Sequence, residues 1–367
     1  MSVQLSLKHK LGFFPALASI WVSILCALVT GLSNRRAKTW YLHIAYAALR
    51  TATKKLSPLQ LQYALSIEAL VDDIAVLTEC RYISPSTGAL YTQYMKKTKQ
   101  TPQTVKLGDS GGYGHWIGSP NASHVLIWYH GGGFGLPANR GYFKFFARLL
   151  ADAERANKSL AVFCLGYTLA PHAQYPTQLR QAVEALRHVL KDHRPENVLL
   201  GGDSAGGNLV GGVLSHLAHT HPEIKPVELS GCLKGAVLLS PWTSLDTEFP
   251  GHEIDSSGDL ITESVAEPWS GAYLGSAKRD FYTDLSTAPA EWYAAFPVES
   301  LLICAGGTEI MYPMLEDLVK RMREGRTVEF VVGERECHVA PIYHLYVGEN
   351  RETEQGKRVK SWLRECI

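Results

Sequence analysis

Ser204 lies in the stretch LLGGDSAGGNLVGG (199–212), with a glycine two positions before it and another two positions after it. An apolar, strand-like run precedes this knot and a helix-like run follows it. A turn this sharp strains the backbone of the serine, and the flanking glycines remove side chains that would clash. The hydroxyl would then stand at a helix N-terminus, whose dipole favours developing negative charge. The pattern predicts a nucleophilic serine, and the alternative is a simple tight turn between strand and helix. A phosphate-binding P-loop is excluded, because the sequence Gly-Lys-Ser/Thr is absent here.

A second glycine run, YHGGGFG (129–135), follows the apolar stretch VLIWYH some 70 residues before the serine. Glycines allow the main chain to come close to a reacting carbonyl, because no Cβ stands in the way. Backbone N–H groups aimed at that carbonyl oxygen stabilise it as it becomes an oxyanion. We therefore expect the N–H groups of Gly132, Gly133 and Ala205 to form an oxyanion hole. A flexible loop is the alternative explanation for the glycine run alone.

A serine hydroxyl needs a base to take its proton, and that base needs a carboxylate to orient it. His338, in GERECHVAPIY, follows the strand-like run TVEFVV, and Glu309, in LLICAGGTEIM, follows an earlier one. The order Ser204, Glu309, His338 is the order that α/β-hydrolase triads follow. Glu316 and Asp317 rank below Glu309 as the acid, because they fall on the helix after the strand end.

The other histidines fit structural positions. His130 belongs to the glycine run, and we expect it to stiffen that loop through hydrogen bonds. His216, His219 and His221 follow the helix after the serine, and we expect them at the surface.

Short apolar strands alternate with helical patterns from residue 125 onward, which predicts a mainly parallel sheet covered by helices on both faces. The predicted strands are 125–130, 160–167, 197–202, 235–240, 300–306 and 327–332. The predicted helices are 177–190, 206–220, 314–324 and 353–366.

Two regions interrupt or precede this alternation. Residues 39–124 are expected to supply cap helices and the first strands, with helical spacing over 39–80 and strands and loops over 81–124. The catalytic core would then run over 125–367, with a cap insertion at about 245–297. Aromatic residues of these regions are expected to form an apolar pocket over the serine: Trp269, Tyr273, Trp292 and Tyr293, together with Phe134, Leu136 and Trp242.

Residues 11–32, LGFFPALASIWVSILCALVTGL, carry no charge over 22 positions. A helix of that length spans the hydrocarbon core of a membrane, about 30 Å. The stretch is longer than the apolar region of a signal peptide and no clear cleavage site follows it. We expect residues 1–38 to be a single-pass anchor, with the endoplasmic reticulum as its membrane. Basic residues flank it almost equally, which leaves its orientation open, and the glycosylation sequons at Asn121 and Asn157 only slightly favour a lumenal catalytic part.

Composition excludes several classes of protein. Lys and Arg number 36 against 35 for Asp and Glu, which gives no electrostatic reason to expect a nucleic-acid partner. The seven cysteines form no Cys-x-x-Cys pair and no Cys/His spacing for zinc. Neither a metal nor another cofactor is expected.

The chain resembles α/β-hydrolases of the hormone-sensitive-lipase type, which have HGGG upstream of the serine. Several stretches over about 125–345 carry the resemblance: HGGGF, GYTLAPHAQYPTQLRQA, GDSAGGNL, LLSPWTSL, LLICAGGTEIM and CHVAP. Among such enzymes, the chain resembles membrane-anchored fungal esterases of the steryl acetyl hydrolase kind, which also have an N-terminal apolar segment. Glu309 stands where the family has Asp, and His172 stands where the family has the Glu of LAPE, a residue that supports the oxyanion loop.

The resemblance implies a carboxylesterase or deacetylase that acts through an acyl-enzyme on a lipophilic ester such as a sterol, terpenoid or polyketide-type metabolite. Acyl transfer to an alcohol or amine would use the same triad, and the fold does not distinguish the two reactions. A cyclase or a binding protein that uses the pocket without an acyl-enzyme is a further alternative.

Overall fold

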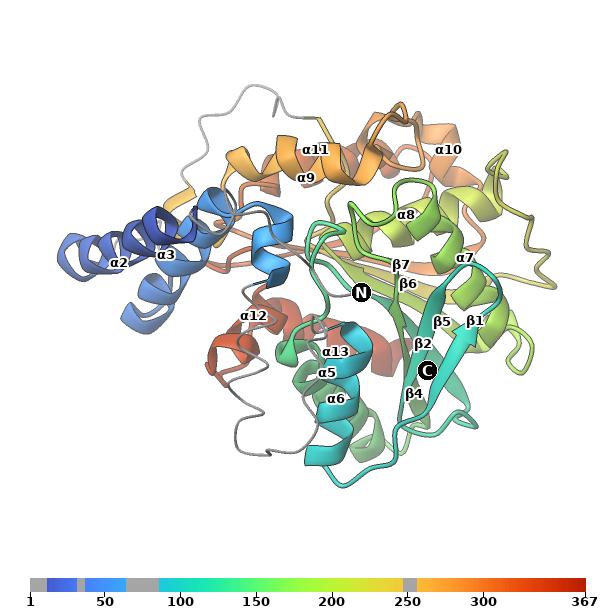
Figure 1. Cartoon of the computed structure of the whole chain (residues 1–367). Helices are drawn as coiled ribbons and strands as arrows, with labels where there is room; N and C mark the ends of the chain where they lie inside the picture. Colours follow the sequence, from blue (N-terminus) through green and yellow to red (C-terminus); the bar gives the residue numbers. More distant parts are fainter. Residues whose placement is uncertain (1–11, 32–36, 64–85, 247–255) are drawn as a thin grey trace.

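The computed structural model of the chain describes residues 12–31, 37–63, 86–246 and 256–367 (Figure 1). Its centre is an eight-stranded sheet with the order β1-β2-β4-β3-β5-β6-β7-β8. The pairs β1–β2 and β2–β4 are antiparallel, and every other pair is parallel. The strands are β1 (Thr104–Leu107), β2 (Gly112–Ile117), β3 (His124–Tyr129), β4 (Leu160–Gly166), β5 (Val198–Asp203), β6 (Leu233–Leu239), β7 (Val298–Gly306) and β8 (Glu329–Gly333).

Helices cover both faces of the sheet, as Figure 1 shows, and each face has its own apolar core. One core joins the strands to α7 (Thr177–Val189), α8 (Ala205–Ala218) and α11 (Tyr312–Met322). The other joins them to α5 (Thr87–Lys97), α6 (Arg140–Arg155), α12 (Ala340–Val347) and α13 (Glu354–Cys366). Burial on both sides explains why the central strands are continuous apolar runs without polar alternation.

The predicted α/β-hydrolase sheet is confirmed, and the six predicted strands and four predicted helices each lie within a few residues of their prediction. The assignment of strands and loops to residues 81–124 is wrong in part, because Thr87–Lys97 form α5. Ser86 caps this helix by accepting a hydrogen bond from the N–H of Ala89, and Tyr91 and Met95 bury one face four residues apart. Residues 64–80, also expected to be helical, lie outside the described residues.

The N-terminal part of the described chain is a pair of helices, α2 (Phe13–Thr30) and α3 (Trp40–Lys55), that pack on one another. The Ser23 hydroxyl of α2 donates a hydrogen bond to the carbonyl of Ala47 in α3. Most of α2 is apolar yet uncovered, whereas α3 buries Leu42, His43 and Tyr46 against the catalytic part. Helix α3 therefore links the apolar helix to the rest of the molecule.

The predicted cap insertion is built from short helices. Its first described half, which includes α9 (Ala266–Leu274), lies above the carboxyl edge of the sheet. Its second half, which includes α10 (Ala290–Ala294), packs against α8 and α11 instead. Only the first half is therefore placed to cover a site at that edge.

Candidate active site

The turn between β5 and α8 holds Ser204 in a conformation that few non-glycine residues adopt, with φ 51° and ψ −119°. The N–H of Ser204 donates to the carbonyl of Leu239 on the neighbouring strand, and the carbonyl of Ser204 accepts from the N–H of Trp242. A Cβ on Gly202 would lie 2.3 Å from the carbonyl oxygen of Gly206, and one on Gly206 would lie 1.9 Å from that of Tyr129. Both glycines are therefore obligatory, and the strain presents the serine hydroxyl at the N-terminus of α8.

The loop after β3 brings its glycines to the same place. Gly132 and Gly133 have positive φ angles of 96° and 56°, and a Cβ on Gly133 would lie 2.1 Å from the ring of Trp269. The carbonyl of Gly132 accepts the N–H of Leu136, which closes the loop into a turn. The N–H groups of Gly132 and Gly133 donate to none of the described residues, so they remain available to an oxyanion.

Asp203, next to the serine, ties the two loops together. Its buried carboxylate accepts hydrogen bonds from the Tyr142 hydroxyl (2.6 Å), the Trp128 indole (3.0 Å) and the N–H of Gly131 (3.1 Å). Burial raises the pKa of Asp203 to about 6, although these hydrogen bonds favour the charged form. The glycine loop and the serine turn are therefore joined by one charged group, a role that the sequence analysis did not assign to Asp203.

His130 stiffens the glycine loop, as expected. Its Nε2 lies 3.0 Å from the Thr87 hydroxyl, its Nδ1 lies 2.8 Å from the carbonyl of Gly131, and its ring stacks on Tyr167 at 4.3 Å. Burial lowers the pKa of His130 to about 4, so the ring is neutral near pH 7.

Glu309 and His338 meet at the carboxyl ends of β7 and β8. Glu309 Oε2 lies 3.3 Å from His338 Nδ1, and both side chains are buried. The loops that carry them approach closely because residue 306 is a glycine: a Cβ there would lie 2.4 Å from the carbonyl oxygens of Glu336 and Cys337. A neutral His338 that donates its Nδ1 proton to Glu309 has a free Nε2 with which to accept the serine proton.

Charge around His338 favours the imidazolium. Burial by itself lowers the pKa of the ring, but the hydrogen bond to Glu309 and the charges of Glu309, Asp259 and Asp203 outweigh burial, and the pKa is raised. A base that gains a proton from the serine is stabilised by the same charges.

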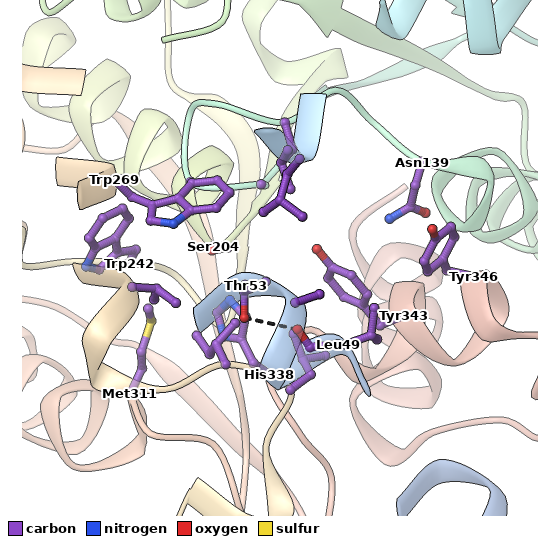
Figure 2. A pocket seen from close by; sticks show the side chains of 18 of the residues that line it. Leu49, Thr53, Asn139, Ser204, Trp242, Trp269, Met311, His338, Tyr343 and Tyr346 are labelled. Atoms are coloured by element: carbon purple, nitrogen blue, oxygen red, sulfur yellow. Dashed lines mark hydrogen bonds between the residues drawn. The ribbon is translucent and has the colours of Figure 1, made fainter. Parts of the chain in front are cut away.

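Ser204 and His338 both line one cavity of about 240 Å³, whose wall is otherwise mainly apolar. A water molecule needs only about 10–15 Å³ of such volume, so the cavity can hold a small organic group. Figure 2 shows Trp242, Trp269 and Met311 on one side of the serine and Asn139, Tyr343 and Tyr346 on the other. Helix α3 adds Leu49, Ala52 and Thr53 to the wall. The hydrogen bond of the described His338 ring is the one to Glu309, on the side opposite Nε2.

The structure corrects part of the predicted pocket. Leu136 and Trp242 line the cavity as expected, but Phe134 does not, because its ring is fully buried and stacked on Tyr273 at 3.5 Å. Among the described residues of the insertion, Trp269 is the one aromatic residue in the lining; the second half of the insertion carries Trp292 and Tyr293 away from it.

Other predicted side chains also lie elsewhere. Glu316 and Asp317 lie on α11, where Glu316 accepts a hydrogen bond from Tyr312, so neither reaches His338. His216 and His221 are buried rather than exposed. The N–H of His221 donates a hydrogen bond to His216 Nδ1, and the Tyr175 hydroxyl lies 2.9 Å from His221 Nε2.

The position of His172 brings in a residue that the sequence analysis missed. His172 Nε2 lies 3.2 Å from the side-chain oxygen of Gln62, and the amide of Gln62 donates to the carbonyls of Gly135 (2.6 Å) and Ala170 (3.0 Å). A side chain from before the catalytic core thus supports the glycine loop. No spacing could have revealed it, since Gln62 lies 110 residues before His172.

Comparison with known proteins agrees with this geometry. A family model described as alpha/beta hydrolase fold matches residues 126–342, more than half of the chain. The chain therefore belongs to the α/β-hydrolase family. This family match, together with the relatives described next, confirms the predicted resemblance to the hormone-sensitive-lipase type and to steryl acetyl hydrolases.

Steryl acetyl hydrolase 1 of Saccharomyces cerevisiae is 33% identical over 161 residues, which are 43% of this chain and 34% of that protein. An acetyl-hydrolase of Streptomyces hygroscopicus is 26% identical over 62% of this chain and 71% of its own length. The crystal structure of the esterase LipW from Mycobacterium marinum superposes with a TM-score of 0.61 at 16% identity, over 91% of this chain and 95% of that one, and shows the shared fold. The chain spans about a third to a half of the length of the first two curated relatives it matches.

Proposed function

We propose that the protein is a serine carboxylesterase that removes a short acyl group, such as acetyl, from a lipophilic alcohol. One observation carries the proposal: the strained Ser204, two unused N–H groups and a histidine paired with a carboxylate border one mainly apolar cavity. Relatives that are named steryl acetyl hydrolase, acetyl-hydrolase and arylacetamide deacetylase support the reaction class.

In the proposed mechanism, Ser204 Oγ attacks the ester carbonyl while His338 Nε2 takes its proton. The carbonyl oxygen becomes an oxyanion held by the N–H groups of Gly132, Gly133 and Ala205. His338 then protonates the leaving alcohol, which departs and leaves an acyl-serine. Water then attacks the acyl-serine while the same imidazole takes its proton; the bond to Ser204 Oγ breaks, and the imidazolium returns the proton to Ser204 as the acid leaves. Glu309 stabilises the imidazolium in both steps.

The apolar wall supports a lipophilic substrate. Helix α3 lines part of the cavity, and it also packs on the apolar helix α2. We propose that α2 anchors the protein in a membrane, with the endoplasmic reticulum as the expected one. The helix is 18 residues long with mean hydropathy 2.1, and its large side chains are mostly uncovered. At 1.5 Å per residue it measures about 27 Å, close to the hydrocarbon thickness.

A serine-directed label tests the proposed reaction. The full chain in detergent should react with a fluorescent fluorophosphonate and hydrolyse p-nitrophenyl acetate, and Ser204→Ala should abolish both. Ser215→Ala is the matched control, because Ser215 lies on the same helix and accepts a hydrogen bond from Trp292 outside the cavity. Wild-type labelling without hydrolysis, with products formed only from an added alcohol, would instead establish an acyltransferase. A folded wild-type protein that neither labels nor turns over would overturn the proposal.

A further inference from the structure

The cap insertion places a second buried carboxylate beside the Glu309–His338 pair. Asp259 Oδ1 accepts hydrogen bonds from the N–H of His338 (2.9 Å) and of Leu260 (2.7 Å). Its Oδ2 accepts the N–H of Ile310 (3.0 Å), the residue directly after Glu309. The Asp259 side chain thus binds the backbone of His338, the proposed base, and the backbone directly after Glu309, the proposed acid.

The turn that carries Asp259 is itself fixed on two sides. From α3, the Arg50 guanidinium donates to the carbonyl of Asp259 (2.6 Å) and to that of Ser257 (3.2 Å). From the loop after β7, the Thr308 hydroxyl lies 3.1 Å from the carbonyl of Gly258. The carboxylate is therefore held in place by elements that do not belong to the triad.

The carboxylate is fully buried, which is costly for a charged group unless hydrogen bonds compensate. Burial raises the pKa of Asp259 to about 6, whereas the positive charge of His338 and the two loop N–H groups act in the opposite direction. Above that pH the group is charged, and charge-assisted hydrogen bonds of this kind are about twice as strong as neutral ones.

We propose that Asp259 is a positioning residue of the catalytic site. It fixes the separation of the loops that carry Glu309 and His338, and it places a second negative charge beside the imidazole. The inference rests on the proposed serine esterase mechanism. Asp259 acts only through the acid and the base, since it does not line the cavity that would hold the substrate.

Several titratable groups surround this pair and bear on any pH measurement. Asp259 is influenced by Glu309 and His338, and it in turn influences Cys337 from the base loop and Tyr46 from α3. Asp203, at the end of β5, also acts on His338. Of these, Glu309, Asp259 and Asp203 are the groups that raise the pKa of His338, so removing the Asp259 charge should lower it.

The variant Asp259→Asn keeps the size of the side chain but replaces one accepting oxygen with a donating amide. Misplacement of reacting groups by about 1 Å can cost roughly 100-fold in rate. We expect kcat on p-nitrophenyl acetate to fall about 10- to 100-fold with little change in KM. The acid limb of the kcat/KM profile should move to lower pH by roughly half a unit or more, because a neighbouring negative charge has been lost.

Two further variants separate charge from structure. Asp284→Asn is the matched control: Asp284 is a buried carboxylate of the same insertion that accepts from the N–H of Leu245 and the hydroxyl of Thr283, away from the triad. It should lower the melting temperature yet leave kcat and the acid limb unchanged. Asp259→Glu retains the charge and should lower kcat without moving the acid limb.

The imidazole pKa of His338, read by NMR titration in wild type and Asp259→Asn, tests the charge without needing turnover. A lower pKa in the variant is the expected result. An unchanged pKa together with unchanged kcat in a folded Asp259→Asn would overturn the inference. If Asp259→Asn does not fold, the Asp259→Glu variant tests the inference. A wild-type kcat in Asp259→Glu would contradict the positioning role of Asp259. A lowered pKa of His338 in Asp259→Glu would contradict the role of the negative charge. A wild-type protein without esterase turnover overturns the proposed function instead, and the NMR comparison still decides the effect of Asp259.

Discussion

At the scale of single residues, the carboxylate paired with His338 belongs to a glutamate, one methylene longer than the aspartate expected from the family resemblance. Glu309 makes its contact through Oε2, and its Oε1 is buried without a hydrogen-bond partner among the described residues. The orientation of the His338 ring at Nδ1 therefore depends on Oε2 of Glu309 alone among the described residues.

Glu309→Gln should lower kcat by about 10³- to 10⁴-fold at pH 8. The amide carries no negative charge, and an amide nitrogen facing Nδ1 would favour the wrong tautomer of His338. Because the raised pKa of His338 depends on Glu309, activity that remains should persist to lower pH than in wild type, since only the neutral ring is a base. Steady-state kinetics between pH 5 and 9 measure both effects.

Glu316→Gln provides the control, because Glu316 is on α11 and only accepts a hydrogen bond from Tyr312. Its kinetics should match wild type. A loss of less than tenfold in Glu309→Gln would mean that Glu309 does not orient the base.

The proposed catalytic residues could be found from the sequence because each stands in a local pattern: glycines around Ser204, a glycine run that includes Gly133, and strand ends before Glu309 and His338. Asp259 stands in no such pattern. It lies 79 residues from His338 in an irregular, polar segment, and only the folded chain brings its carboxylate to the two loops. Positioning residues that act over such separations have no spacing rule.

At the scale of elements, the proposed oxyanion loop packs so closely on Trp269 of α9 that residue 133 has no room for a side chain. Gly133→Ala should lower kcat by about 10²- to 10³-fold, the usual cost of one lost oxyanion donor. The added methyl would collide with the indole, and the positive φ would be strained as well. Burst-phase and steady-state kinetics would locate the loss in the acylation step.

Gly271→Ala is the matched control within α9, where an added Cβ meets nothing within 4 Å. It should raise the melting temperature slightly, because alanine favours helix, and leave kcat unchanged. Wild-type activity in Gly133→Ala would exclude this loop from the oxyanion hole.

Helices and strands could be predicted where the spacing of apolar residues and the length of the segment both fit the same type of element. Strand β4 is a seven-residue apolar run buried at nearly every position, and α7 shows a clean helical period. Helix α6 was not predicted, although its buried Tyr142, Phe146, Leu149 and Ala153 recur every three or four residues, which is a helical period. The short helices of the insertion gave no period at all, and their place depends on packing against α8 and α11.

At the scale of the whole molecule, the proposed anchor makes its orientation testable. Asn121 and Asn157 are both exposed, in turns that a glycan could reach. If the catalytic part is lumenal, the chain expressed in eukaryotic cells should shift in mobility on endoglycosidase treatment, and Asn121→Gln with Asn157→Gln should abolish the shift. The protein should also resist extraction by alkaline carbonate, whereas a chain lacking residues 1–38 should be released. No shift in wild type would assign the catalytic part to the cytosol, and carbonate release of wild type would contradict the anchor.

Part of the cavity wall comes from residues outside the family match. Ser204, His338 and the glycine loop lie within the family match, whereas Leu49, Ala52, Thr53 and Leu61 precede it. Substitutions at Leu49, Ala52 and Thr53 of α3 would therefore change the wall while leaving Ser204, His338 and the glycine loop as they are. Paralogues are expected to diverge in substrate through these three positions, whereas Arg50 and Gln62 of the same segment, which hold the Asp259 turn and the glycine loop, are expected to stay unchanged.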